Sequence, residues 1–189
     1  LSWVFRPPSE IRNIVKQMEE VGVRSLPVVL VTATFTGMVL ALQSYSGFQR
    51  FGATSLVGSV VALSITRELG PVFAGLMVSG RVGASMAAEL GTMKVTEQID
   101  ALVTLATNPV KYLVVPRVVA ATLVLPVLVV FADLVGILGG YFVSVYLMGA
   151  NPYVYIAKTY QYLEFKDIYT GLVKASVFGM LIALISCHH

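Results

Sequence analysis

The chain has 189 residues, of which 57% are hydrophobic and 12% are charged, and its formal net charge is +3. Soluble globular domains carry about 25% charged residues, so this composition excludes a soluble protein and indicates that most of the chain lies in lipid. Nucleic acid is excluded as a partner because the basic residues are scattered and form no cluster with interleaved aromatic side chains.

The length limits how often the chain crosses a membrane. One spanning helix needs roughly 20 mostly apolar residues, so there is room for about four spans and their loops but for no separate soluble domain. The sequence therefore predicts an all-α integral membrane protein in which residues 1–189 form a single domain.

Residues 7–22 are predicted to form an amphipathic helix. The apolar face consists of Ile11, Ile14, Val15 and Met18, and the charged residues off this face are Arg12, Lys16, Glu19 and Glu20. A helix of this kind beside a membrane span lies in the plane of the interface. A solvated helix packed on a partner protein is the alternative.

Two apolar segments follow. Residues 26–42 contain no charge and form the first predicted span, and residues 43–55 are a polar linker. Residues 56–90 form the second predicted span, which at about 1.5 Å per residue is longer than the roughly 30 Å hydrocarbon core. Gly70 and Pro71 are expected to break or kink this span, since proline removes a helical hydrogen bond.

A short helix is predicted at residues 94–108. Thr96 is expected to cap its first turn, and Glu97 and Asp100 favour the positive end of the helix dipole. Its apolar stripe consists of Ile99, Leu102, Val103 and Ala106. About a dozen helical residues are too few to cross a bilayer, so this helix is expected to lie across a loop between two spans.

Two further spans are predicted at residues 113–147 and 169–187, separated by a tyrosine-rich loop at 148–168. Seven Lys or Arg residues lie in the N-terminal segment and in the loop around the short helix, against three or four on the opposite side. The positive-inside rule therefore places the N-terminus and the loop at 91–115 in the cytoplasm.

Charged residues inside apolar segments are costly and mark functional sites or buried pairs. They are Arg67, Glu68, Arg81, Glu89 and Asp133. Arg67 and Glu68 are adjacent and point about 100° apart on a helix, so each needs its own partner or water. They are candidate cavity residues, with a marking of the outer interface as the alternative. The other three are interpreted as structural charges, and Arg81 is expected to pair with Asp133.

Catalytic motifs are absent from the sequence. It contains no G-x-x-x-x-G-K-[ST] phosphate loop, no H-E-x-x-H and no G-x-S-x-G, and its two histidines are terminal. Cys187, His188 and His189 lack a partner cluster and are interpreted as a helix end rather than a metal site. We expect no catalytic residue, no metal and no cofactor in this chain, so transport or scaffolding remains.

Three stretches carry a resemblance to a known family: RELGPVFAGLMVSGRVGASMAAELGTMKVTEQIDALVTLATNPVKYLVVPR at 67–117, GMVLALQ at 37–43 and GILGGY at 136–141. They resemble the MlaE/YrbE family of ABC-transporter permeases, in the family's order and over nearly the whole chain. Family members continue with a Gly-rich loop and one more span, so the chain resembles a C-terminally truncated copy.

The resemblance implies a homodimeric permease of the bacterial inner membrane, with cytoplasmic ATPase subunits that bind ATP and Mg and with periplasmic MCE-domain proteins. It implies phospholipids or related lipids as substrates. The helix at 94–108 matches the family's coupling helix, with ATPase contacts at Thr96, Glu97, Asp100 and Leu102. Arg67 and Glu68 match a motif near the lipid cavity, which is expected to be lined also by Leu40, Tyr45, Phe48 and Phe51.

Two other functions stay open from the sequence. A membrane scaffold would organise partner proteins without moving a substrate. A secondary transporter driven by an ion gradient would act without an ATPase, but such a carrier has no need of a docking helix in the cytoplasm.

Overall fold

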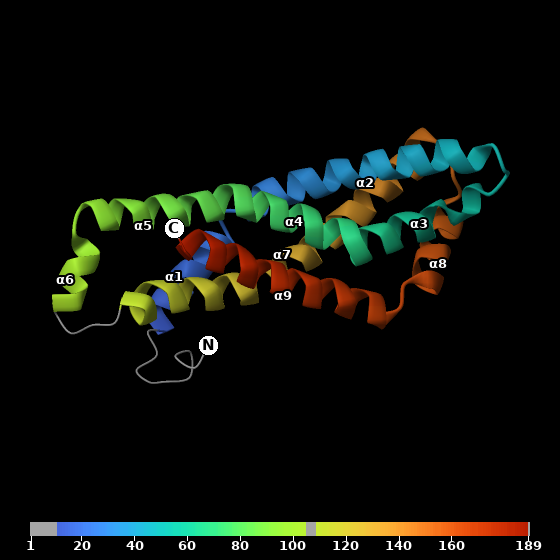
Figure 1. The fold of residues 1–189 in the computed structure, drawn as a ribbon. Helices are drawn as coiled ribbons and strands as arrows, with labels where there is room; N and C mark the ends of the chain where they lie inside the picture. Colours follow the sequence, from blue (N-terminus) through green and yellow to red (C-terminus); the bar gives the residue numbers. More distant parts are fainter. Residues whose placement is uncertain (1–10, 105–108, 189) are drawn as a thin grey trace. The chain divides into compact units, whose positions relative to one another are not determined.

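The computed structural model describes residues 11–104 and 109–188, and all regular structure within these two ranges is helical. The α-helices are α1 (Ile11–Val21), α2 (Leu26–Gln49), α3 (Val57–Ser64), α4 (Gly70–Val78), α5 (Ala84–Val95), α6 (Gln98–Thr104), α7 (Val115–Phe142), α8 (Pro152–Tyr162) and α9 (Phe165–His188) (Figure 1). Wider, π-helical turns occur at Ile65–Leu69, Ser79–Gly83, Val110–Val114 and Val143–Leu147.

Four helical segments in the described ranges are long and apolar enough to cross a membrane: Arg12–Gln49, Thr54–Val95, Val110–Leu147 and Phe165–His188. A helix satisfies its backbone N–H and C=O groups internally, which is the condition for crossing lipid. The prediction of an all-α integral membrane protein is confirmed, and the chain is a multi-pass membrane protein.

The helix ends differ from the predicted ends. α2 continues to Gln49, through much of the stretch predicted as a polar linker. Polar side chains there bond back to the helix, as Ser46 does when its hydroxyl donates to the Leu42 carbonyl over 2.9 Å. α8 occupies the middle of the predicted loop at 148–168, because Asn151 caps its first turn and Pro152 suits the first helical position.

The chain stays helical through Gly70 and Pro71, where a break or kink is predicted. The π-helical turn Ile65–Leu69 ends there, and the Gly70 N–H donates to the Ile65 carbonyl oxygen, five residues back. In a regular α-helix the proline ring would clash with the carbonyl four residues back, whereas the wider turn accommodates it. A π-helical turn thus takes the place of a break.

The chain packs as two compact units. Of the described residues, 11–26, 75–104, 109–125 and 176–188 belong to the first unit, and Pro27–Ala74 and Pro126–Ala175 form the second. Each has its own apolar core, so each is described separately.

The second unit is centred on a buried cluster of Ala41, Val57, Val61, Ile65 and Val143. The backbones of α2 and α7 touch beside it, since a Cβ atom on Gly37 would overlap the carbonyl oxygen of Gly136. α8 lies beside α3 (Figure 1), where the Thr159 hydroxyl donates to the Gly58 carbonyl oxygen over 3.3 Å. These contacts hold the segment that carries Arg67.

The first unit has a smaller cluster of Val118, Ala121 and Ala183. α1 is anchored by the fully buried Val21, while Val15 of the predicted apolar stripe is 57% exposed. Residues 7–10 of the predicted amphipathic helix and the side chain of Ile11 lie outside the described part of the chain. α5 and α6 meet at a sharp corner (Figure 1).

Candidate functional site

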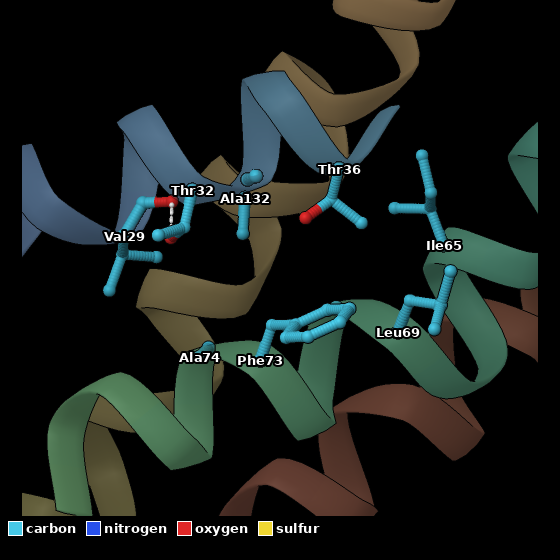
Figure 2. Close-up of a pocket in the computed structure, with 10 residues that line it drawn as sticks. Val29, Thr32, Thr36, Ile65, Leu69, Phe73, Ala74 and Ala132 are labelled. Atoms are coloured by element: carbon cyan, nitrogen blue, oxygen red, sulfur yellow. Dashed lines mark hydrogen bonds between the residues drawn. The ribbon is translucent and has the colours of Figure 1, made fainter. Parts of the chain in front are cut away.

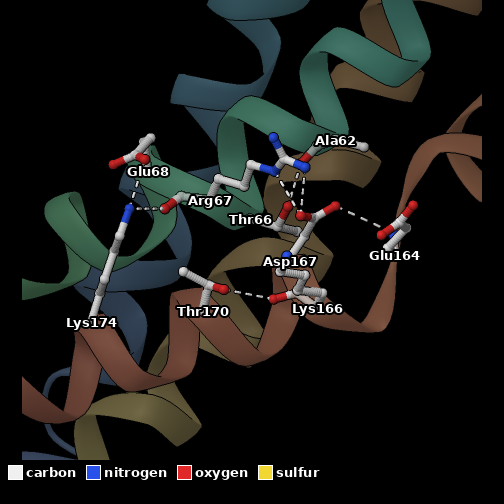
Figure 3. Close-up of polar contacts among 9 residues, drawn as sticks. All are labelled: Ala62, Thr66, Arg67, Glu68, Glu164, Lys166, Asp167, Thr170 and Lys174. Carbon is white, nitrogen blue, oxygen red and sulfur yellow. Dashed lines mark hydrogen bonds and ion pairs between the residues drawn. The ribbon is translucent and has the colours of Figure 1, made fainter.

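Arg67 and Asp167 form the centre of a polar cluster in the second unit (Figure 3). The Nη2 and Nε atoms of Arg67 lie 2.6 Å and 2.7 Å from Oδ1 of Asp167, and the Glu164 N–H donates to Oδ2 over 3.3 Å. The Asp167 side chain is 6% exposed, whereas that of Arg67 is 52% exposed. A buried carboxylate therefore fixes a guanidinium group that remains accessible on its other side.

Lys174 of α9 belongs to the same polar cluster. Its Nζ atom lies 2.6 Å from Oε1 of Glu68 and donates to the carbonyl oxygen of Arg67 over 3.1 Å. Arg67 and Glu68 thus have separate partners, as the sequence predicts. The four charges sum to zero, so the cluster does not repel a dipolar or anionic group by net charge.

The backbone explains why Lys174 reaches a carbonyl. In an α-helix the Arg67 oxygen would accept from the N–H of residue 71, but Pro71 has none. The Thr66 oxygen loses its usual donor as well, because the Gly70 N–H bonds to Ile65 instead. Lys174 supplies a donor for Arg67, and the Thr66 oxygen lies against Gly171, where a Cβ atom would overlap it.

A small apolar pocket opens in the second unit between α2, α4 and α7 (Figure 2). It is lined by Val29, Thr32, Ala33, Thr36, Ile65, Leu69, Gly70, Phe73, Ala74 and Ala132. The Thr32 hydroxyl donates to the carbonyl oxygens of Val28 and Val29 over 2.8 Å and 3.0 Å, so its polarity is satisfied within α2. This pocket was not predicted from the sequence, in which its signal is a pair of threonines four residues apart in an apolar span, Thr32 and Thr36.

The predicted cavity residues of the first span do not line that pocket. Leu40, Tyr45 and Phe48 are half-buried and pack against the core cluster of the second unit. Phe51 is 84% exposed in the turn after α2. Their contact with a substrate stays a prediction.

The predicted pair between Arg81 and Asp133 stays a prediction, because the two residues belong to different units. Within the first unit, Nη1 of Arg81 donates to the Ser25 hydroxyl over 2.8 Å. Within the second unit, Asp133 lies against Gly70. A hydroxyl at the start of the first span is therefore a partner of Arg81 that the sequence did not predict.

Glu89 forms an ion pair with Arg117, which was not predicted from the sequence. Its Oε2 atom lies 2.7 Å from Nη2 of Arg117, whose side chain is 3% exposed. The signal in the sequence is a basic residue, Arg117, at the beginning of the third predicted span. This pair links α5, before α6, with α7, after it.

The predicted cap at Thr96 is wrong. α5 continues to Val95, and the Thr96 hydroxyl donates back to the Thr92 carbonyl oxygen over 2.8 Å, so Thr96 closes α5 instead of opening α6. Glu97 forms the corner with a φ of 58°, and α6 begins only at Gln98. The local reason is that threonine bonds to a preceding carbonyl as readily as it caps a following helix.

α6 is mostly exposed. Asp100 and Val103 are exposed, Leu102 is half-buried, and Lys94 lies 3.9 Å from Asp100 across the corner. The predicted residues 105–108, with Ala106 of the apolar stripe, lie outside the described part of the chain. α6 is therefore a short exposed helix of mixed polarity, which stands between α5 and α7 in the chain.

Comparisons with known proteins match almost the whole chain. The family described as Permease MlaE matches residues 14–189. A probable ABC transporter permease of Rickettsia typhi is 55% identical over 188 residues, which cover 100% of this chain and 73% of that protein. One from Synechocystis is 45% identical over 176 residues, covering 93% and 67%. The Arabidopsis thaliana chloroplastic protein named Trigalactosyldiacylglycerol 1 is 40% identical over 176 residues, covering 93% and 50%.

Proposed function

The chain belongs to the MlaE permease family and is the permease component of an ABC transporter, and from this premise we propose that it moves phospholipids between the bacterial inner membrane and periplasmic MCE-domain carriers. ATP hydrolysis then belongs to a separate ATP-binding subunit. One relative is named after trigalactosyldiacylglycerol, a glycerolipid, which supports lipid as the substrate class. The observation that carries the proposal is the half-exposed guanidinium of Arg67, anchored on the buried Asp167.

A phospholipid has an anionic phosphate and apolar chains, so its path needs an oriented donor beside apolar surface. Arg67 is such a donor, because a guanidinium binds phosphate through two parallel hydrogen bonds and Asp167 fixes its orientation. Two residues of the same π-helical turn, Ile65 and Leu69, line the apolar pocket. In this proposal Arg67 meets the phosphate, Glu68 holds Lys174, and the acyl chains contact the pocket and Leu40, Tyr45, Phe48 and Phe51.

α6 is the proposed coupling helix, which docks on the ATP-binding subunit. Exposed Asp100 and half-buried Leu102 provide polar and apolar contacts, with Thr96 and Glu97 at the corner. The ion pair of Glu89 and Arg117 joins α5, which precedes α6, to α7, which follows it. In this proposal a displacement of α6 is therefore transmitted to α5 and α7 together. Two copies of the chain and two ATP-binding subunits, which hold ATP and Mg, complete the proposed transporter.

The test is lipid transfer by the full-length protein, reconstituted in vesicles with its ATP-binding subunit. Arg67→Gln is expected to slow transfer about tenfold or more, equivalent to about 1.4 kcal/mol, while the complex assembles and keeps its basal ATP hydrolysis. Lys166→Gln is the matched control, because Lys166 of α9 is an exposed cation next to Asp167 and forms no ion pair with any described residue. Unchanged transfer by Arg67→Gln would remove the headgroup role.

The same assay separates the two other functions. A scaffold would show no ATP hydrolysis stimulated by lipid. An ion-driven carrier would transfer lipid in vesicles that lack the ATP-binding subunit. Either result would contradict the proposed function.

A further inference from the structure

The second apolar segment contains two π-helical turns, and each carries an arginine. Arg67 lies in Ile65–Leu69, and Arg81 lies in Ser79–Gly83. π-Helical turns are rare and frequently occur at functional sites. The first arginine is neutralised by the carboxylate of Asp167, whereas the second is held by the neutral hydroxyl of Ser25 at 2.8 Å. The two turns therefore differ in how their charge is balanced.

The contact with Ser25 also sets the depth of Arg81. Ser25 is 1% exposed and directly precedes Leu26, where the charge-free apolar run of α2 begins. Arg81 is itself exposed, although it belongs to an apolar segment. A guanidinium held where a span enters its apolar layer lies at the level of lipid headgroups.

A polar groove of the first unit surrounds this guanidinium. One wall is α1 with Arg24 beyond its end, and the groove is lined among others by Glu20, Arg81, Ser85 and Glu89. Both carboxylates already have an arginine: Glu20 lies 3.0 Å from Arg24, and Glu89 lies 2.7 Å from the buried Arg117. No carboxylate among the described residues of the first unit is paired with Arg81, so its positive charge is not balanced by an ion pair within this unit.

We propose that this groove binds the phosphate of an anionic phospholipid from the leaflet in which α1 lies. Arg81 is the main ligand, since a guanidinium presents several donors to phosphate oxygens, and the Ser85 hydroxyl offers another. Arg24 is the second cation, because its pair with Glu20 is solvent-exposed and such pairs are weak enough to open. This lipid is a bound component that ties α1 to α5, and the proposal does not require that it is transported.

The test is native mass spectrometry of the purified full-length protein, titrated with phosphatidylglycerol or with phosphatidylcholine. The wild-type protein is expected to bind phosphatidylglycerol about tenfold more tightly, and Arg81→Gln is expected to lower this ratio to about twofold or less, a loss of about 1 kcal/mol. Arg81→Lys should fall between the two. Arg12→Gln, which removes an exposed charge of α1 outside the groove, should keep the wild-type ratio.

Two further variants make the result specific. Ser25→Ala removes the hydrogen bond to Arg81 but keeps the charge, so most of the preference for phosphatidylglycerol should remain. That result would show that Arg81→Gln acts through the lost charge and not by loosening the fold. Arg67→Gln should retain the preference even if it abolishes transfer, which keeps this proposal distinct from the proposed function. An unchanged ratio in Arg81→Gln would overturn the site. Equal binding of both lipids together with displacement by inorganic phosphate would show a small-anion site and would overturn the lipid assignment.

Discussion

Arg117 and Glu89 form an ion pair of 2.7 Å in which the cation is buried and the carboxylate is 55% exposed. The pair joins α5, which precedes α6 in the chain, to α7, which follows it. The unequal burial of the partners means that the two halves of the pair contribute differently to stability.

Removing the exposed partner is expected to cost more than removing the buried one. Glu89→Gln leaves a buried guanidinium without its counter-charge, for which we expect a loss of about 3 kcal/mol in the free energy of unfolding. Arg117→Met removes the buried charge itself and leaves an exposed carboxylate, so a loss of about 1 kcal/mol is expected. Equilibrium unfolding in detergent measures both, and equal losses would contradict the unequal burial.

Lys174 is expected to stabilise the π-helical turn through the Arg67 carbonyl as well as through Glu68. Lys174→Met removes both contacts and should lower the free energy of unfolding by about 1–2 kcal/mol. Lys166→Met, on the same α9, should change it by less than about 0.5 kcal/mol. The comparison fails if high salt removes the whole difference, since the hydrogen bond to the carbonyl does not depend on the ion pair.

Gly171 allows α9 to approach the carbonyl oxygen of Thr66. In Gly171→Ala the new Cβ atom would overlap this backbone atom, and moving the helices apart is expected to cost about 1–3 kcal/mol. Gly47→Ala in α2 is the control, because its Cβ atom would meet nothing within 4 Å and helix propensity favours alanine by up to about 1 kcal/mol. Thermal unfolding should shift in opposite directions, and a shared direction would rule out the close approach.

Tyr155 should make the protein less stable at alkaline pH. Burial raises the pKa of its phenol above the ordinary value of about 10, and its hydroxyl donates to the Ile137 carbonyl oxygen over 3.4 Å. The stabilising effect is complete below the unfolded pKa and is lost as pH rises towards the folded one, because the unfolded chain releases its proton first. Stability measured from pH 9 to 12 should fall less steeply in Tyr155→Phe; identical slopes would contradict the burial effect.

Much of the fold follows from properties that any segment carries by itself. Hydropathy and length predict four spans, since the transfer of an apolar segment into lipid depends on its own residues. The angle between neighbouring side chains on a helix predicts that Arg67 and Glu68 have different partners, and they bond to Asp167 and Lys174. The family resemblance adds the permease assignment, which the comparisons confirm.

Partners and boundaries were decided by the tertiary structure. Arg81 bonds to Ser25, a partner that the sequence did not predict, and Thr96 turns back to α5 rather than capping α6. The helix continues through Pro71 because a π-helical turn precedes the proline and because Lys174, far along the chain, donates to the Arg67 carbonyl oxygen. Sequence alone determined which segments enter the membrane, because that free energy is local. It could not determine which polar atoms meet, because each hydrogen bond depends on what another helix brings within about 3 Å.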